Sequence, residues 1–212
     1  MRNLSRLPPL YPLTDTELSG LSHAEQVRQL ASGGATLIQL REKRMEARAF
    51  YEEAKRALEV GREFGATILI NDRVDLCLAV EADGVHLGQD DIHPIEARRL
   101  LGEKAVIGYS THNVEQVREA IEFPIDYLAI GPIFLTTSKS NPDPEVGIAG
   151  LQRVKEFIGN IPLVAIGGIT PALAPTVLNA GADSVAMISA LLVAPEGLTQ
   201  RTQQILETLS AA

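Results

Sequence analysis

Length, charge and cysteine content bound what this protein can be. The chain has 212 residues, 45% of them hydrophobic, which is enough for one buried core, and we expect a single domain over residues 1–212. Its formal net charge of −8 argues against a general role on nucleic acid or at a membrane surface, because both favour a basic face. Cys77 is the only cysteine, which excludes an intramolecular disulfide framework and a thiolate metal cluster.

Targeting signals are not expected from the residue pattern. Prolines cut the apolar run near the N-terminus too short for a signal peptide, and no run reaches the roughly 18 apolar residues of a membrane span. With the lone cysteine, these features make a cytoplasmic location the default expectation. We expect small-molecule partners, no nucleic acid, no membrane, and a monomer or a homodimer.

Short apolar runs alternate with amphipathic segments along the whole chain. The runs are continuously apolar, as in LIQL, TILI and YLAI, which is typical of parallel strands buried on both faces. We predict eight strands, over residues 7–13, 35–40, 66–72, 84–88, 105–108, 126–133, 162–166 and 184–188. We predict eight helices, over residues 22–32 and 46–64, around Cys77, and over residues 94–102, 113–122, 148–158, 170–181 and 195–209.

The order of these elements predicts the fold. Eight strand–helix alternations in a chain of this length favour an α/β protein, a single-domain (β/α)8 TIM barrel. A doubly wound open sheet is the alternative. In a TIM barrel the working groups lie at the carboxyl ends of the strands and in the loops that follow, so polar residues at those positions are the candidate site.

Charged side chains follow the second predicted strand. Arg41 and Lys43 alternate along the chain, so we expect them to point the same way and to bind one polyanion. Arg41 would use a bidentate fork and Lys43 a point charge. The alternative is a solvated strand end without function.

Acids follow the third and fourth predicted strands. Asp72 and Asp91 come after neighbouring strands that are joined by about one helix, and such a pair suits a hard divalent cation. Asp90 lies beside Asp91 and competes for the same role. Alternatively, each acid is the N-cap of the helix that follows it.

Glycines follow the seventh predicted strand. Gly167 and Gly168, together with Ile188 and Ser189 after the eighth strand, match the common phosphate site of this fold, where backbone N–H groups bind the anion. The alternative is that the glycines only terminate a strand.

Residues 134–147 form the longest connection in the chain. They include Thr136 to Lys139, so we interpret the connection as a lid that closes on a ligand, with a solvated loop as the alternative. His86 lies within a strand and is expected to be a buried, supporting residue. His112 follows a strand and either acts as a general base or faces away into the next helix.

Taken together, these residues resemble the thiamine-phosphate synthase family. Single pieces occur in many phosphate-binding barrels, whereas the ordered set is specific. The resemblance covers essentially the whole chain and is carried by residues 39–43 (QLREK), 70–73 (INDR), 84–91 (GVHLGQDD), 107–112 (IGYSTH), 131–134 (GPIF), 136–139 (TTSK), 165–168 (AIGG) and 185–189 (VAMIS).

The resemblance implies an Mg²⁺-dependent transferase that joins a hydroxymethylpyrimidine diphosphate to a thiazole phosphate, giving thiamine phosphate and diphosphate. It implies a metal site at Asp72 and Asp91. Four residues would also act in catalysis: Arg41, Lys43, Ser110 and Lys139. The implied ligands of the pyrimidine diphosphate are Gln39, Leu40, Arg41, Glu42, Lys43, Asn71, Ser110 and Lys139. The implied ligands of the thiazole phosphate are Thr136, Thr137, Ser138, Gly168, Ile188 and Ser189.

The chemistry of this reaction suits such residues. An electron-rich aminopyrimidine can stabilise positive charge on its methylene carbon, so the protein mainly has to help diphosphate leave. We therefore hypothesise a dissociative substitution without a protein nucleophile.

Two positions depart from the family pattern, since Leu135 replaces a usual proline and Ser138 a usual threonine. Two rival functions remain. One is the related thiazole tautomerase, which handles the thiazole phosphate alone. The other is a non-catalytic sensor of phosphate ligands.

Overall fold

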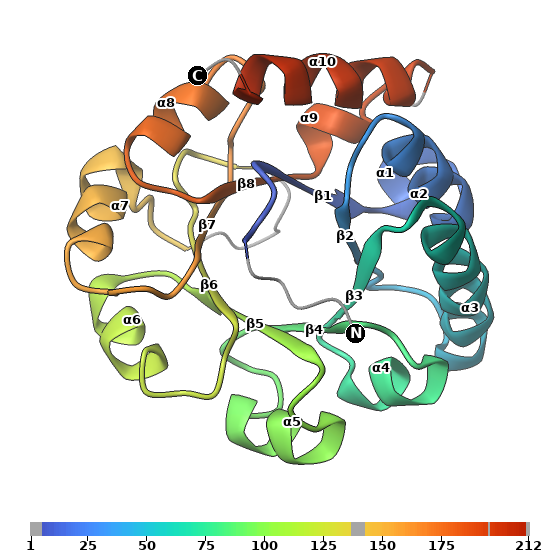
Figure 1. Ribbon diagram of the computed structural model, residues 1–212, viewed down its shortest axis with the longest axis horizontal. Coiled ribbons are helices and arrows are strands. Elements are labelled where there is room, and N and C mark those ends of the chain that lie inside the picture. The colour runs from blue at the N-terminus through green and yellow to red at the C-terminus, as the bar shows by residue number, and fades with distance from the viewer. Residues whose placement is uncertain (1–5, 137–142, 195, 211–212) are drawn as a thin grey trace.

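Eight parallel strands form the centre of the molecule (Figure 1). The computed structural model describes residues 6–136, 143–194 and 196–210. The strands are β1 (Leu10–Thr14), β2 (Leu37–Leu40), β3 (Thr67–Asn71), β4 (Gly84–Leu87), β5 (Val106–Thr111), β6 (Tyr127–Ile130), β7 (Leu163–Ile166) and β8 (Ser184–Met187). Each strand pairs with the next, and β8 pairs with β1 to close the barrel. The predicted TIM barrel is therefore confirmed, and the open doubly wound sheet is wrong.

Helices surround the barrel on its outer side (Figure 1). Those of the described residues are α1 (Thr16–Ser19), α2 (His23–Ser32), α3 (Ala47–Phe64), α4 (Val74–Val80), α5 (Pro94–Leu101), α6 (Val114–Ala120), α7 (Gly147–Lys155), α8 (Ala174–Asn179), α9 (Ser189–Leu192) and α10 (Leu198–Ser210). The sequence did not predict α1 and α9, because four residues are too few to show a helical period. None of these helices combines the length and apolar character needed to cross a membrane.

Two predicted helix starts are confirmed by side-chain caps. The side chain of Ser22 accepts the N–H of Glu25 at 3.2 Å, and that of Asn113 accepts the N–H of Gln116 at 2.8 Å. The predicted start of α8 at Thr170 is wrong, because the N–H groups of residues 173 and 174 both donate to the Thr170 carbonyl at 3.0 Å, forming a turn before the helix begins. Pro195, the predicted start of the last helix, lies outside the described residues.

Strand side chains alternate between the barrel interior and the helix-covered side, as the two-residue period of a strand requires. Leu37 packs in the interior with Tyr11 and Tyr127, whereas Ile38 and Leu40 pack between the sheet and the helices. All five are at most 1% exposed. Both faces of the sheet are therefore buried, which explains why the strands read as continuous apolar runs.

An aspartate before each of the strands β4, β6 and β8 makes hydrogen bonds at the amino-terminal edge of the barrel. Each carboxylate accepts a backbone N–H from the start of the preceding strand, and each aspartate N–H donates back to the carbonyl of that same residue. The three carboxylate bonds are Asp83 to Ile68 (2.8 Å), Asp126 to Ile107 (2.7 Å) and Asp183 to Leu163 (2.8 Å). We call these three pairs the aspartate clamps.

Replacing Asp126 by alanine should destabilise the barrel. The buried N–H of Ile107 would lose this acceptor, and the guanidinium of Arg98 would lose an ion pair at 2.7 Å. We expect the free energy of unfolding to fall by about 1–3 kcal/mol, as for other buried groups left without a partner. Urea unfolding measures the change. The exposed Glu103→Ala is the control, with an expected change of at most about 0.5 kcal/mol. Equal losses in the two variants would contradict the clamp.

Candidate active site

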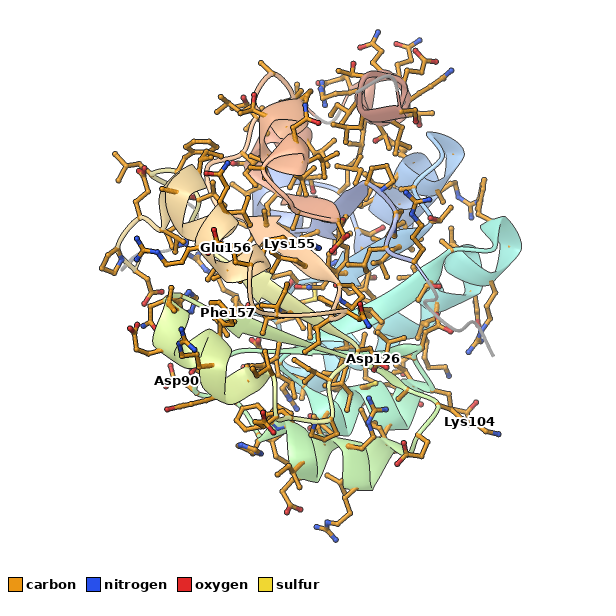
Figure 2. All side chains as sticks on the ribbon, turned by 60° about the vertical axis from the view of Figure 1, so that its left-hand side comes forward. Asp90, Lys104, Asp126, Lys155, Glu156 and Phe157 are labelled. Carbon is orange, nitrogen blue, oxygen red and sulfur yellow. The ribbon has the colours of Figure 1, made fainter. Side chains whose placement is uncertain are left out.

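The candidate residues lie at the carboxyl ends of the strands, as predicted. Figure 2 shows Asp90, which follows β4, on the left of the molecule and Lys104, which precedes β5, on the right. The aspartate clamps and the candidate site therefore occupy opposite ends of the barrel.

Asp72 and Asp91 bring two carboxylates together beyond β3 and β4. The N–H of Asp72 donates to the carbonyl of His86 at 2.8 Å, and the N–H of Gly88 donates to Oδ2 of Asp91 at 2.7 Å. Partial burial, together with the neighbouring carboxylate of Asp72, raises the pKa of Asp91. Two carboxylates this close favour a bound cation, because a like charge disfavours ionisation of its neighbour.

Neither acid caps a helix, so that alternative is wrong. The N-cap of α4 is Arg73, and that of α5 is His93. Asp72 instead occupies a tight turn with a φ of 62°, across which the N–H of Arg73 donates to the carbonyl of Asn71 at 2.7 Å. A positive φ is strained for a residue with a side chain, and such strain is often kept at functional sites.

Arg41 and Lys43 lie in the loop after β2, which ends at Leu40, so they do not alternate along a strand as predicted. The guanidinium of Arg41 donates to the carboxylate of Asp15 at 2.6 Å. The ammonium of Lys43 instead pairs with Asp72. The two cations therefore pair with different acids, Arg41 with Asp15 after β1 and Lys43 with Asp72 after β3.

The carboxylate of Glu42 holds this loop. Its Oε1 accepts the three backbone N–H groups that follow it, at 2.8, 2.8 and 3.2 Å. Its Oε2 accepts the hydroxyl of Thr16 at 2.9 Å and lies 3.4 Å from Nε2 of the buried His23. Burial alone would raise the pKa of Glu42, but the hydrogen bonds outweigh it and hold the pKa at about 2. The side chain of this predicted ligand is thus turned into the loop that it shapes.

Polar side chains of the barrel interior lie below the acids. Gln39 and Asn71 are 1% and 7% exposed, and Oγ of Ser110 lies 2.8 Å from Nε2 of His86, which is buried as predicted. Oε1 of Gln39 is buried without a hydrogen-bond partner among the described residues, which leaves an acceptor for a ligand. The side chain of Leu40 packs on the helix-covered side, so only its backbone can face the site.

The glycines after β7 lie against the loop that follows β6. Gly167 and Gly168 have φ values of 97° and 64°. A Cβ on Gly168 would lie 2.5 Å from the carbonyl oxygen of Leu135, and the N–H of Phe134 donates to the carbonyl of Gly167 at 3.0 Å. Glycine is therefore needed at position 168 so that the loop after β6 can pass close to the end of β7.

The end of β8 completes this side of the site. Ile188 is the N-cap of α9 and Ser189 is its first residue. The first N–H groups of a helix have no acceptor within the helix and favour anions. Thr136, half-buried, follows the residues that cross Gly168. The remaining predicted residues of the loop lie outside the described residues: Thr137, Ser138 and Lys139.

His112 contacts the end of β6. Its Nδ1 lies 2.7 Å from the carbonyl oxygen of Gly131 and 3.5 Å from the carboxylate of Asp143. These contacts favour a role in anchoring the loop after β6 over a role as general base.

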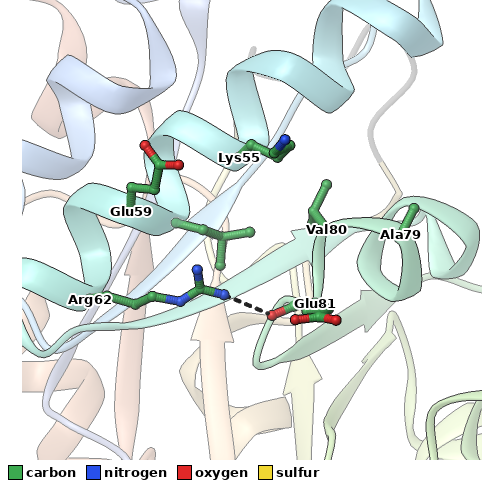
Figure 3. Close-up of a pocket in the computed structure, with 7 residues that line it drawn as sticks. Lys55, Glu59, Arg62, Ala79, Val80 and Glu81 are labelled. Atoms are coloured by element: carbon green, nitrogen blue, oxygen red, sulfur yellow. Dashed lines mark hydrogen bonds between the residues drawn. The ribbon is translucent and has the colours of Figure 1, made fainter.

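A cavity of about 190 Å³ between α3 and α4 lies apart from this site (Figure 3). Its wall includes Lys55, Glu59 and Arg62 of α3, and Arg62 donates to the carbonyl of Glu81 at 3.5 Å. It contains none of the predicted site residues and belongs to the packing of two outer helices.

The donor set of the site fits a magnesium ion. Across residues 6–136, 143–194 and 196–210, no group of three or more His, Cys, Asp and Glu forms a complete metal cage. Asp72 and Asp91 offer a pair of carboxylates instead. Magnesium commonly uses one or two carboxylates and takes its other ligands from water and substrate phosphates.

Fold and site together define a (β/α)8-barrel enzyme with acids and cations clustered at the strand ends. The family described as thiamine monophosphate synthase matches residues 10–191, and the chain belongs to this family.

Individual relatives agree with this assignment. The thiamine-phosphate synthase of Chloroflexus aurantiacus is 44% identical over 197 residues, which cover 92% of this chain and 90% of the relative. That of Clostridium novyi is 47% identical over 185 residues, covering 86% and 90%. The solved structure of thiamine phosphate pyrophosphorylase from Pyrococcus furiosus matches with a TM-score of 0.88 at 36% identity, covering 99% and 98% of the two chains.

Asp15 is a site residue that sequence reasoning missed. It follows β1 and holds Arg41, and its side chain also accepts the N–H groups of residues 17 and 18 at 3.1 Å. Its position just after a predicted barrel strand, like that of Asp72, was the available signal.

Replacing Glu42 by glutamine should destabilise the protein in a pH-dependent way. The pKa of Glu42 is about 2 in the folded protein, below the ordinary value of 4.5, so its stabilisation is complete above the ordinary value and is lost as the pH falls toward 2. At neutral pH we expect a loss of about 1–3 kcal/mol, because three backbone N–H groups and the Thr16 hydroxyl lose a charged acceptor. The difference in Tm from wild type should shrink in acid.

Scanning calorimetry across the acid range measures this difference. Glu46→Gln is the control, since Glu46 is exposed and its side chain makes no cap hydrogen bond. A Tm difference for Glu42→Gln that does not change with pH would contradict the assignment.

Proposed function

We propose that this protein joins a hydroxymethylpyrimidine diphosphate to a thiazole phosphate, optionally carboxylated, and releases diphosphate. The observation that carries the proposal is the pair of acids with cations beside it at the strand ends of a barrel of this family. A protein that handled only the thiazole phosphate would have no use for that cluster, which disfavours a tautomerase.

The diphosphate would be bound by the loop after β2. Arg41 has five N–H donors, so it can hold Asp15 and a phosphate oxygen at once. Lys43 would exchange Asp72 for a phosphate oxygen once a metal neutralises that acid. Asn71 and Lys139 would complete the contacts.

We propose that Asp72 and Asp91 hold Mg²⁺ through their carboxylates, with the other coordination positions left to water and diphosphate oxygens. When bound, the metal neutralises negative charge that builds up on the leaving diphosphate. The surroundings of Asp91 support this proposal, because its carboxylate is partly buried beside that of Asp72, and burial and this like charge both raise its pKa.

We propose a dissociative substitution. The bond between the pyrimidine methylene carbon and the diphosphate oxygen breaks first, and the thiazole nitrogen then attacks the carbocation. Arg41, Lys43 and Lys139 would stabilise the departing charge, and Ser110 would contact the pyrimidine side. No protein nucleophile is needed. Burial raises the pKa of Cys77 to about 12, so the one thiol of the chain is unreactive.

The thiazole phosphate would lie at the ends of β7 and β8. The backbone at Gly168, Ile188 and Ser189 would supply N–H donors, and the loop after β6 would supply the hydroxyls of Thr136, Thr137 and Ser138. Closure of that loop would exclude water, which could otherwise capture the carbocation.

We also propose a cytoplasmic enzyme, monomeric or homodimeric, that acts on small molecules without nucleic acid or membrane. The net charge of −8 and the single buried cysteine support this proposal.

A coupling assay with both phosphorylated substrates and Mg²⁺ tests the function, with diphosphate and thiamine phosphate measured together. Asp72→Asn and Asp91→Asn should each lower kcat/KM by about 10²-fold or more, because the leaving group loses its electrostatic stabilisation. Asp90→Asn is the matched control, since this exposed neighbour is expected to leave the rate unchanged.

Other outcomes would overturn the proposal in distinct ways. Wild-type rates in both acid variants would remove the metal assignment. Conversion of the thiazole phosphate alone would indicate a tautomerase, and binding of both ligands without product would indicate a sensor.

A further inference from the structure

A chain of hydrogen bonds crosses the barrel interior from β2 to β5. Nε2 of Gln39 donates to the hydroxyl of Tyr11 at 2.9 Å, and the Tyr11 and Tyr127 hydroxyls lie 2.9 Å apart. The Tyr127 hydroxyl lies 2.7 Å from Nδ1 of His86, and Nε2 of His86 lies 2.8 Å from Oγ of Ser110. These residues come from five different strands, so this chain of hydrogen bonds links most of the barrel to the hydroxyl of Ser110, a candidate catalytic residue.

Packing fixes the members of this chain in place. The Tyr11 and Tyr127 rings meet edge-on with centroids 5.9 Å apart, and the His86 and Tyr127 rings stack at 5.6 Å. Gly108 makes room for the phenol, because a Cβ there would lie 2.2 Å from the Tyr127 hydroxyl oxygen. Burial raises the pKa of both tyrosines, so each phenol keeps its proton and can donate it.

The amide at one end sets the direction of the chain. The nitrogen of Gln39 only donates, so the Tyr11 oxygen accepts there. Among the residues that the structure describes, the other partner of the Tyr11 hydroxyl is Tyr127. Tyr11 therefore donates its hydroxyl proton in a hydrogen bond to the Tyr127 oxygen. Tyr127 then has its own proton for Nδ1 of His86.

The tautomer of His86 follows from this direction. A neutral imidazole that accepts at Nδ1 carries its proton on Nε2, and that proton is donated to Oγ of Ser110. A serine that accepts this bond keeps its own proton for another acceptor. Without the tyrosines, Ser110 could donate to the imidazole instead and would offer a ligand only a lone pair.

We propose that Tyr11 and Tyr127 are positioning residues for the reaction, which act through His86 to present the hydroxyl proton of Ser110 to the bound pyrimidine diphosphate. The identity of that ligand rests on the proposed function, whereas the direction of the chain does not. The two parts can therefore be tested separately.

The tautomer is tested in the intact protein labelled with ¹⁵N-histidine, by long-range ¹H–¹⁵N correlation at mildly alkaline pH. His86→Gln identifies the resonance. The expected result is the neutral ring protonated on Nε2, and a ring protonated on Nδ1 would overturn the proposal. The measurement needs no substrate, so it decides the direction of the chain even if the coupling assay detects no product.

Conservative variants test the effect on the reaction. Tyr127→Phe removes the donor to His86, so we expect a mixed tautomer and a fall in kcat of about 10- to 100-fold, as for other small losses of orientation. Tyr11→Phe leaves the bond between Tyr127 and His86 possible and should have a smaller effect. Tyr51→Phe on α3, where the ring lies under Lys55 at 5.4 Å, is the matched control and should leave both readouts unchanged.

Circular dichroism checks that each variant is folded. A folded Tyr127→Phe protein with the wild-type tautomer and the wild-type kcat would overturn the positioning role. A purely structural role would lower Tm in this variant without changing the His86 tautomer.

Discussion

Two carboxylates held side by side at the ends of neighbouring strands are the constraint on which the site depends. Asp72 sits in a turn with positive φ and its N–H donates to the carbonyl of His86, whereas the carboxylate of Asp91 accepts the N–H of Gly88. Lys43 pairs with Asp72, and partial burial together with the Asp72 carboxylate raises the pKa of Asp91. In the proposed function, these two acids would hold a magnesium ion, and diphosphate oxygens would supply further ligands.

The rest of the structure supports that pair from two directions. Glu42 binds the backbone of the loop after β2 and so places one cation beside β1 and the other beside the acids. In the barrel interior, the hydrogen bonds that run from Gln39 to Ser110 connect polar side chains in what would otherwise be an apolar core. The aspartate clamps stabilise the opposite end of the barrel, so stability and chemistry are largely separated between its two faces.

The barrel and the presence of acids after β3 and β4 could be predicted because both depend on local pattern, whereas the choice of Asp91 over Asp90 came from the family resemblance. The separate acid partners of Arg41 and Lys43 could not be predicted, because they depend on a loop whose backbone is held by the carboxylate of Glu42. The contact between Tyr11 and Tyr127 could not either, because 116 residues separate them and only the strand register brings them together. Local pattern locates a site in this fold, whereas its internal contacts depend on the closed sheet.

Calorimetric titration of diphosphate with and without Mg²⁺ tests the central claim most directly, after correction for binding of Mg²⁺ to free diphosphate. If the two acids bind Mg²⁺ and diphosphate supplies further ligands to the metal, Mg²⁺ should raise the affinity for diphosphate by about tenfold or more. Diphosphate should then raise the affinity for Mg²⁺ by the same factor. Asp72→Asn should abolish this coupling. Independent binding of the two in the wild-type protein, or full coupling in Asp72→Asn, would contradict the account.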